Sequence, residues 1–169
     1  MKHIEIKLSE ITLRTLDLSD DLQNYLYWMN HPKNNEYILA VKKSHSLADL
    51  QDFIKACNVS PNTILLGIFD TTFHAHIGNI KYENIDLANK TTEMGILIGE
   101  RNYRGRGIAK NIIEESAKWL NVNLSLQTIF LRVDQNNSAA LKLYSKIGFI
   151  PDNNQLENGL KMLWNLNVR

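Results

Sequence analysis

The sequence predicts a single α/β domain over residues 1–169, in which a central mixed sheet is flanked by helices. The length of 169 residues suits one domain with a proper core and is too short for two comfortable ones. An apolar fraction of 44% and a net charge of +1 are typical of a globular protein. Apolar residues recur with strand-like or helical spacing in the order β, α, α, three strands, α, β, α, β, β.

The N-terminal elements are a strand and a helix. Residues 11–14 alternate and suit an opening strand, with residues 4–8 as another before it. The helix begins at Ser19 or Asp20 and ends at Pro32. Its apolar face has five members at helical spacing: Leu18, Leu22, Tyr25, Leu26 and Met29.

A second helix begins at Ser46, and Asp49 three residues later is typical of a helix N-terminus. The side chains expected to be buried on this helix are Leu47, Leu50, Phe53, Ile54 and Cys57. Three strand-like segments follow, at residues 63–69, 76–85 and 91–98, and turn residues separate them.

The C-terminal part alternates between the two types of element. It comprises a helix over 108–120, a strand over 128–133, a helix that ends at 147, and strands over 149–150 and 160–166. Asn137 or Ser138 is expected to cap the second of these helices at its N-terminus. Gly148 suits its C-cap, because glycine adopts the left-handed conformation that ends many helices.

Composition narrows the class of function and the compartment. Cys57 is the only cysteine, which excludes an intrachain disulfide and a cysteine-based metal site. The near-neutral charge argues against a broad nucleic-acid surface. The charged N-terminus is unlike a signal peptide, and no apolar run reaches membrane-spanning length. We therefore expect a cytoplasmic protein that binds neither nucleic acid nor membrane.

A basic glycine turn between a strand and a helix is the most informative segment. The strand is expected over residues 94–99, and the turn reads Arg104, Gly105, Arg106, Gly107, Ile108, Ala109. Arg101 and Lys110 extend the positive charge on either side. Glycines let backbone N–H groups approach a phosphate, and a helix N-terminus favours an anion. This segment predicts a pyrophosphate site.

Two spaced motifs, in this element order, resemble the GNAT superfamily of acetyl-CoA-dependent N-acetyltransferases. Arg104, Gly107 and Ala109 fit the phosphate motif of that family. One strand later comes its second signature, which here is Asn137, Tyr144, Gly148 and Phe149. The resemblance covers residues 11–150 and implies a mostly antiparallel sheet with about four helices. It also implies acetyl-CoA as co-substrate and a reaction by direct attack of a primary amine in a ternary complex.

The resemblance assigns the donor side of the site. Backbone N–H groups over residues 105–109 would bind the pyrophosphate, and Ile96, Leu97 and Ile98 would pair with the pantetheine arm. Asn137 would contact the pantetheine region, although an N-cap role is by itself a sufficient structural reason for it. A buried strand is likewise a sufficient reason for residues 94–99, and the two interpretations are compatible.

Two residues are candidates for proton transfer. Tyr144 could donate a proton to the departing thiolate, or it could be a core aromatic in line with Leu141 and Ile147. Glu93 could accept a proton from the amine, directly or through water, or it could be an exposed carboxylate at a strand end. A water chain in place of Glu93 also stays open.

The acceptor side is less defined. The N-terminal pattern is Leu13-Arg14-x-Leu16 with Asp20, followed by Tyr25-x-x-Trp28-Met29-Asn30-x-Pro32. It is similar to the branch of this family that acetylates ribosomal-protein N-termini, amino sugars and polyamines. The substrate-binding candidates are Trp28, Asn30, His31 and Tyr37. We rank an amino sugar or sugar nucleotide first, a peptide N-terminus second and a polyamine third, because no acidic cluster is apparent near these residues.

Other functions remain as alternatives. The chain lacks the glycine patterns of Rossmann and Walker sites and the serine elbow of hydrolases. A non-catalytic coenzyme A-binding module is the main alternative to an enzyme. His74 and His76 could share a strand face as metal ligands do, but no third ligand is apparent, so we expect no metal. The oligomeric state stays open, with a homodimer among the options.

Overall fold

The computed structural model describes residues 3–31, 44–152 and 159–167. Its strands are β1 (Glu5–Lys7), β2 (Ile11–Thr15), β3 (Ile64–Asp70), β4 (His76–Asp86), β5 (Thr91–Ile98), β6 (Thr128–Val133), β7 (Ile150–Pro151) and β8 (Leu160–Asn165). Its helices are α1 (Gln23–Asn30), α3 (Leu47–Val59), α4 (Ile108–Leu124), α5 (Ser138–Ile147) and the short 3₁₀ helix η1 (Arg101–Tyr103).

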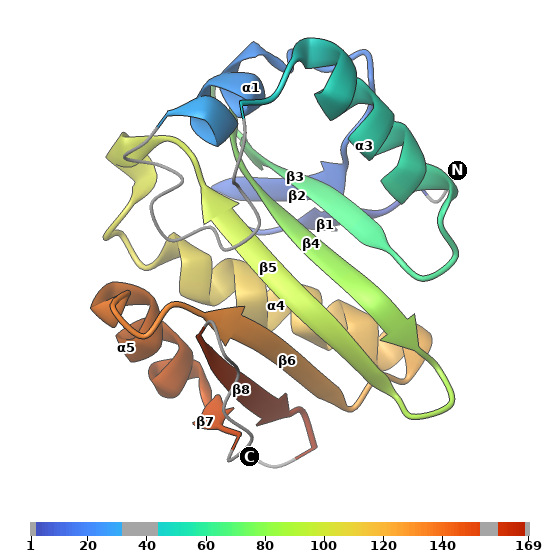
Figure 1. The fold of residues 1–169 in the computed structure, drawn as a ribbon, viewed down its shortest axis with the longest axis vertical. Helices are drawn as coiled ribbons and strands as arrows, with labels where there is room; N and C mark the ends of the chain where they lie inside the picture. The colour runs from blue at the N-terminus through green and yellow to red at the C-terminus, as the bar shows by residue number, and fades with distance from the viewer. Residues whose placement is uncertain (1–2, 32–43, 153–158, 168–169) are drawn as a thin grey trace.

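One eight-stranded sheet holds all the described strands, in the order β1-β2-β3-β4-β5-β6-β8-β7 (Figure 1). Every neighbouring pair is antiparallel except β5 and β6, which are parallel. The mixed, mostly antiparallel sheet expected from the sequence is therefore confirmed. The four α-helices of the described ranges also agree with the expected number.

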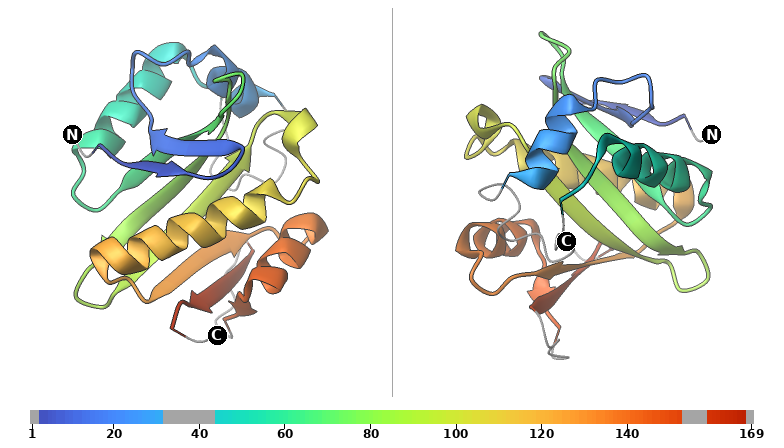
Figure 2. Two further views of the ribbon diagram at one scale, coloured as in Figure 1. Left: turned by 180° about the vertical axis from the view of Figure 1, so that it is seen from behind. Right: turned by 45° about the horizontal axis from the view of Figure 1, so that its top comes forward.

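Helices cover both faces of the sheet. α1 and α3 pack on one face, while α4 and α5 lie on the other (Figures 1 and 2). β3 is buried along its whole length, as expected for a strand inside a sheet with helices nearby. No helix in the described part of the chain is long and apolar enough to cross a membrane.

Local capping signals predicted three helix ends correctly. Ser46 accepts a hydrogen bond from Asp49 N, and the Asp49 carboxylate accepts one from Ser46 N, which completes a capping box. Asn137 Oδ1 accepts from Ala140 N at 3.1 Å at the start of α5. Gly148 ends that helix with a φ of 119°. These ends depend on groups a few residues apart, so the sequence alone reveals them.

The start of the first helix was predicted wrongly, whereas four of the five members of its predicted apolar face pack in the core. α1 begins at Gln23 instead of Ser19 or Asp20, because the Asp20 carboxylate is engaged elsewhere. It accepts two hydrogen bonds from the Arg14 guanidinium and a third from Asp17 N. The expected stripe member Leu18 is exposed, whereas Trp28, which lies off that stripe, is buried.

Phe53 of α3 also differs from its expected burial. It is exposed, and the Lys81 ammonium lies 5.5 Å from the centre of its ring. The other four apolar residues predicted on this face pack in the core with α1, and Cys57 is buried as expected. Phe53 lies at the margin of that face, where the sheet below carries a charged side chain.

β5 and β6 pair over only three residues. Their register runs from Thr91 opposite Thr128 to Glu93 opposite Phe130. Beyond that point β5 pairs only with β4 and β6 only with β8, among the strands that the structure describes. The two strands therefore part at Glu93, and one edge of β5 carries no neighbouring strand from Met94 onward.

The end of β5 is shaped by one close contact. Trp28 lies flat against Gly99, so that a Cβ at this position would come within 1.9 Å of its Cδ2 atom. The Trp28 side chain is only 1% exposed. Only glycine allows the indole to approach the backbone this closely.

Gly99→Ala should therefore destabilise the protein by about 1–3 kcal/mol, because the buried indole must move. Urea unfolding monitored by Trp fluorescence measures this loss. Gly95→Ala is the matched control on the same strand face, since a Cβ there meets no atom of the described residues within 4 Å. It should stay within about 1 kcal/mol of wild type. Equal midpoints for the two variants would contradict the contact.

Candidate active site

The loop after β5 is held firmly against its neighbour strand. Gly99 N and Glu100 N both donate to the carbonyl of Ile77, at 2.9 and 3.1 Å. These bonds continue the pairing with β4 beyond the end of β5. The loop therefore leaves the sheet in a defined direction.

A second anchor fixes η1. The Tyr103 hydroxyl donates to Asp70 Oδ2 at 3.0 Å. Hydrogen bonds to the carboxylate from Phe73 N, from Tyr103 and from Thr72 N lower the pKa of Asp70. Asp70 is consequently ionised at neutral pH and remains a strong acceptor. The segment between β5 and α4 is thus attached at both its start and its middle.

The predicted basic cluster does not converge on one point. Arg104 turns back to the strand, where its Nε and Nη2 atoms donate to the carbonyls of Ile98 and Gly99 at 2.8 and 3.1 Å. The Arg106 guanidinium lies 5.6 Å from the centre of the Tyr103 ring. The side chain of Arg104 thus holds the turn in shape and is itself bound to strand carbonyls.

The start of α4 has the properties of an anion site. Gly107 is the N-cap with a φ of 77°, and no side chain caps the helix. The helix has 17 residues, and its first N–H groups and its dipole both favour a negative charge. A Cβ built on Gly107 meets no atom of the described residues within 4 Å. The turn therefore leaves room for a ligand next to the backbone and fits the pyrophosphate predicted for it.

Residues 96–98 lie on the unpaired edge of β5. Ile96 and Ile98 pack on the core shared with α4, whereas Leu97 packs on the core shared with α1 and α3. Their side chains hold the strand between two apolar layers, and their backbone edge faces the gap left by β6. After β5, a loop and η1 lead to the turn at Gly107, so an open strand edge and a helix N-terminus follow one another along the chain, as a site for a long extended ligand requires.

Glu93 lies at the point where β5 and β6 part, and its carboxylate contacts two neighbouring side chains. Its Oε1 lies 3.2 Å from Arg132 Nε, and its Oε2 accepts from Asn84 Nδ2 at 3.2 Å. The Glu93 side chain is 13% exposed, while that of Arg132 is 53% exposed. The carboxylate is therefore ordered by two neighbours at the start of the open edge.

Tyr144 has a protonated hydroxyl with no partner in the described part of the protein. Its ring packs 5.6 Å from that of Phe149, measured between centroids. Burial raises the pKa of Tyr144 to about 12, because the charged phenolate loses hydration. The phenol therefore keeps its proton at neutral pH and can donate it. Its position remains compatible with both interpretations of this residue, acid and core aromatic.

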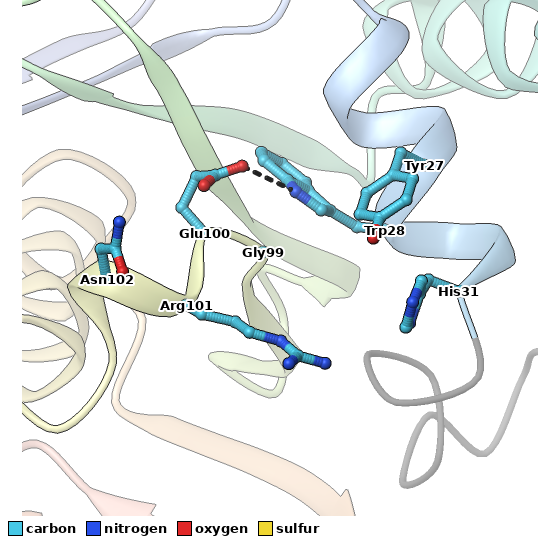
Figure 3. Close-up of a pocket in the computed structure, with 7 residues that line it drawn as sticks. All are labelled: Tyr27, Trp28, His31, Gly99, Glu100, Arg101 and Asn102. Carbon is cyan, nitrogen blue, oxygen red and sulfur yellow. Dashed lines mark hydrogen bonds between the residues drawn. The ribbon is translucent and has the colours of Figure 1, made fainter.

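A pocket of about 350 Å³ opens between the end of α1 and the loop after β5 (Figure 3). Tyr27, Trp28 and His31 line one side, and residues 99–102 line the other. Figure 3 shows the indole turned toward Glu100, and Trp28 Nε1 donates to Glu100 Oε1 at 3.2 Å. We call this cavity the Trp28 pocket.

The predicted acceptor residues divide into three groups. Trp28 and His31 line the Trp28 pocket. Asn30 does not, because its amide exchanges hydrogen bonds with the backbone N and O of His45, at 2.7 and 2.8 Å. Tyr37 lies outside the described residues. Glu93 lies six residues from Gly99 along β5, or about 20 Å at strand spacing, so it does not belong to this pocket.

Sequence reasoning missed Glu100 as a pocket residue. The only local signal was its position directly after an apolar strand that ends in glycine. Its role depends on Trp28, which is 72 residues away along the chain. Such a contact leaves no periodic pattern in the sequence.

The two histidines do not share a strand face. His74 lies in the exposed turn before β4, with a φ of 53°, whereas His76 is buried in β4. His76 Nε2 donates to the carbonyl of Gly78 and to Asn79 Oδ1, both at 2.9 Å. The described residues hold no group of three or more His, Cys, Asp or Glu side chains suited to a metal.

Named proteins and solved structures resemble the chain along most of its length. A spermidine N(1)-acetyltransferase from Vibrio cholerae is 23% identical over 152 residues, which cover 88% of this chain and 84% of that protein. The crystal structure of spermidine N-acetyltransferase from Vibrio cholerae with CoA and spermine superposes with a TM-score of 0.84 at 21% identity, covering 95% and 98% of the two chains.

A second structure, the Microcin C7 self immunity acetyltransferase MccE with acetyl-CoA and AMP, has a TM-score of 0.78 at 20% identity, and covers 94% of each chain. These similarities establish the fold. The model of the acetyltransferase (GNAT) domain matches residues 10–150, which is most of the sequence and includes the turn at Gly107, the open edge of β5 and Tyr144. The chain therefore belongs to the GNAT acetyltransferase family.

Proposed function

We propose that this enzyme transfers the acetyl group of acetyl-CoA to a primary amine of a small molecule, and that the acceptor is a polyamine. The reaction is a direct attack by the amine in a ternary complex. One observation carries the proposal: the unpaired edge of β5 is followed along the chain, after a loop and η1, by an uncapped helix N-terminus. An extended strand edge followed by an anion site matches a ligand with a long polar arm and a pyrophosphate.

The donor is held by backbone groups. N–H groups from Gly105 to Ala109 bind the pyrophosphate, and residues 96–98 pair with the pantetheine arm. Asn137 is a further donor to this arm, because its Oδ1 is used by the N-cap bond while its Nδ2 has no partner among the described residues. Acetyl-CoA supplies the activated thioester carbonyl.

Two side chains move the protons. Glu93 takes a proton from the acceptor ammonium, directly or through water, and the neutral amine forms the new C–N bond. As the C–S bond breaks, Tyr144 gives its proton to the thiolate, which leaves as a thiol. The pairing of Glu93 with Arg132 holds that carboxylate in one orientation for this task.

The acceptor assignment reverses the order inferred from sequence. On sequence grounds, an amino sugar was the first candidate acceptor and a polyamine was the third. The spermidine N(1)-acetyltransferase relative and the superposed structure with spermine now favour a polyamine. Neither of these two proteins is named for an amino sugar acceptor. N-terminal acetylation of a protein and a non-catalytic coenzyme A-binding role are the remaining competitors.

Gly107→Ala should weaken binding of coenzyme A roughly tenfold or more. The added methyl group stands where the phosphate must meet backbone N–H groups, and charge-assisted hydrogen bonds are lost. Titration calorimetry with coenzyme A measures the affinity. The left-handed φ also costs about 1 kcal/mol of stability, so urea unfolding must confirm that the variant is folded. Unchanged affinity in the folded variant would exclude this placement.

Tyr144→Phe should lower turnover roughly 10- to 1,000-fold, because the variant cannot protonate the leaving thiolate. Affinity for acetyl-CoA should change little, since the phenyl ring fills the same space beside Phe149. Steady-state kinetics at saturating substrates and calorimetry separate these effects. Full turnover in the variant, with chemistry rate-limiting, would leave Tyr144 as a packing residue.

A panel of acceptors tests the reaction and the substrate class. Wild-type enzyme with acetyl-CoA and spermidine should release coenzyme A and yield a product heavier by one acetyl group. Glucosamine and a ribosomal-protein N-terminal peptide should react much more slowly. Release of thiol is followed colorimetrically, and the products by mass spectrometry. Faster acetylation of glucosamine or the peptide would overturn the polyamine assignment, and turnover of none of the acceptors would favour the non-catalytic role.

A further inference from the structure

The Trp28 pocket contains a carboxylate that is only partly used. Glu100 Oε1 accepts the hydrogen bond from the Trp28 indole at 3.2 Å. No Lys, Arg or His in the described ranges forms an ion pair with Glu100. A single neutral N–H group does not balance its charge. Arg104 acts on Glu100 electrostatically but forms no ion pair with it within 4 Å, so the described part of the chain leaves the carboxylate without a direct cationic contact.

The surroundings of this carboxylate suit an ammonium group. Tyr27 contributes an exposed aromatic ring, and Trp28 contributes the edge of its indole to the wall. Aromatic rings and a carboxylate together are a common means of binding an organic cation. Arg101 and His31 also line the pocket and are the groups that would oppose a cation. The sign of the ligand's charge is thus the decisive property to test.

The indole is held in place from behind. His76 packs edge-on to it, with ring centroids 5.2 Å apart, and Phe69 stacks on His76 at 4.9 Å. On the other side it lies against the backbone of Gly99. Because these contacts hold the Trp28 ring in place, its Nε1 orients the Glu100 carboxylate. The Glu100 carboxylate is therefore preorganised for binding a ligand.

The pocket and the reaction site lie along one face of β5. Side chains alternate along a strand, so Glu93, Gly95, Leu97 and Gly99 share a face, and Leu97 packs in the core with α1 and α3. Gly95 is open on this face, in the part of the chain that the structure describes. From Gly95 to Gly99 the strand spans about 13 Å. An acceptor with amino groups at both ends can span such a distance, whereas a compact monoamine cannot.

We propose that the Trp28 pocket binds a protonated amino group of the acceptor other than the one that is acetylated, with Glu100 as its counter-ion. The ligand class is an extended di- or polyamine. The inference rests on the proposed reaction and adds a specificity-determining subsite to it. The pocket selects acceptors by the presence and the distance of a second cation.

The test compares Glu100→Gln with wild type on spermidine and on n-butylamine. Glutamine keeps the acceptor for the Trp28 indole and removes the charge. KM for spermidine should rise roughly tenfold or more, the effect of losing a charged hydrogen bond, while KM for n-butylamine and for acetyl-CoA stays unchanged. Calorimetry of spermidine binding to the coenzyme A complex should show the same loss.

Two further variants give the controls. Glu115→Gln makes the same change on α4, in an exposed pair with Lys118, and should leave both KM values unaltered. Arg101→Gln removes a positive charge from the pocket and should leave the KM for spermidine equal or lower. A several-fold rise in that KM would mean that the pocket takes an anion, and it would overturn the proposal.

The outcomes for the subsite and for the reaction are distinguishable. Equal KM values for spermidine in wild type and Glu100→Gln, with normal acetylation, would remove the subsite and keep the proposed function. Turnover of no amine by wild type would remove the proposed function. In that case calorimetry still decides the subsite, because spermidine binding that depends on Glu100 supports it and binding that does not depend on Glu100 refutes it.

Discussion

The parting of β5 from β6 is the constraint on which the other features of the site depend. Three residue pairs hold these parallel strands together, and beyond Glu93 each strand keeps only its antiparallel neighbour. Backbone groups on a strand edge need partners, and in a folded sheet they normally find them in the next strand. The open edge of β5 therefore creates the most direct place for an extended ligand. After η1 the chain reaches the uncapped start of α4, where an anion is favoured.

The Trp28 pocket depends on a different kind of contact, the packing of Trp28 on Gly99. The indole is supported by His76, and the Arg14 guanidinium lies 3.8 Å from the centre of the Phe69 ring behind it. Arg14 is in turn paired with Asp20 in the segment that leads into α1. This chain of contacts joins the first helix to the end of β5. It explains how Trp28 of α1 comes to shape a pocket beside the loop after β5.

The fold was largely predictable because most of its elements carry local signals. The capping box at Ser46, the N-cap at Asn137 and the left-handed Gly148 each involve groups within a few residues of one another. The start of α1 was not predictable in this way. Asp20 is a good N-cap residue, but Arg14, from the preceding strand, engages its carboxylate. A strong charge-assisted pair took precedence over a local preference.

The sequence by itself determined the family, the glycine turn over residues 104–109 and the signature from Asn137 to Phe149, because these depend on residue type and short spacing. Tertiary structure alone decided which way the side chains of the turn point. Arg104 folds back on Ile98 and Gly99, so its guanidinium is bound to the strand carbonyls. It also decided that Glu100 meets Trp28 across 72 residues. Contacts between distant segments depend on how the sheet twists and where the helices dock. The spacing of residues along the chain predicts neither the twist nor the docking.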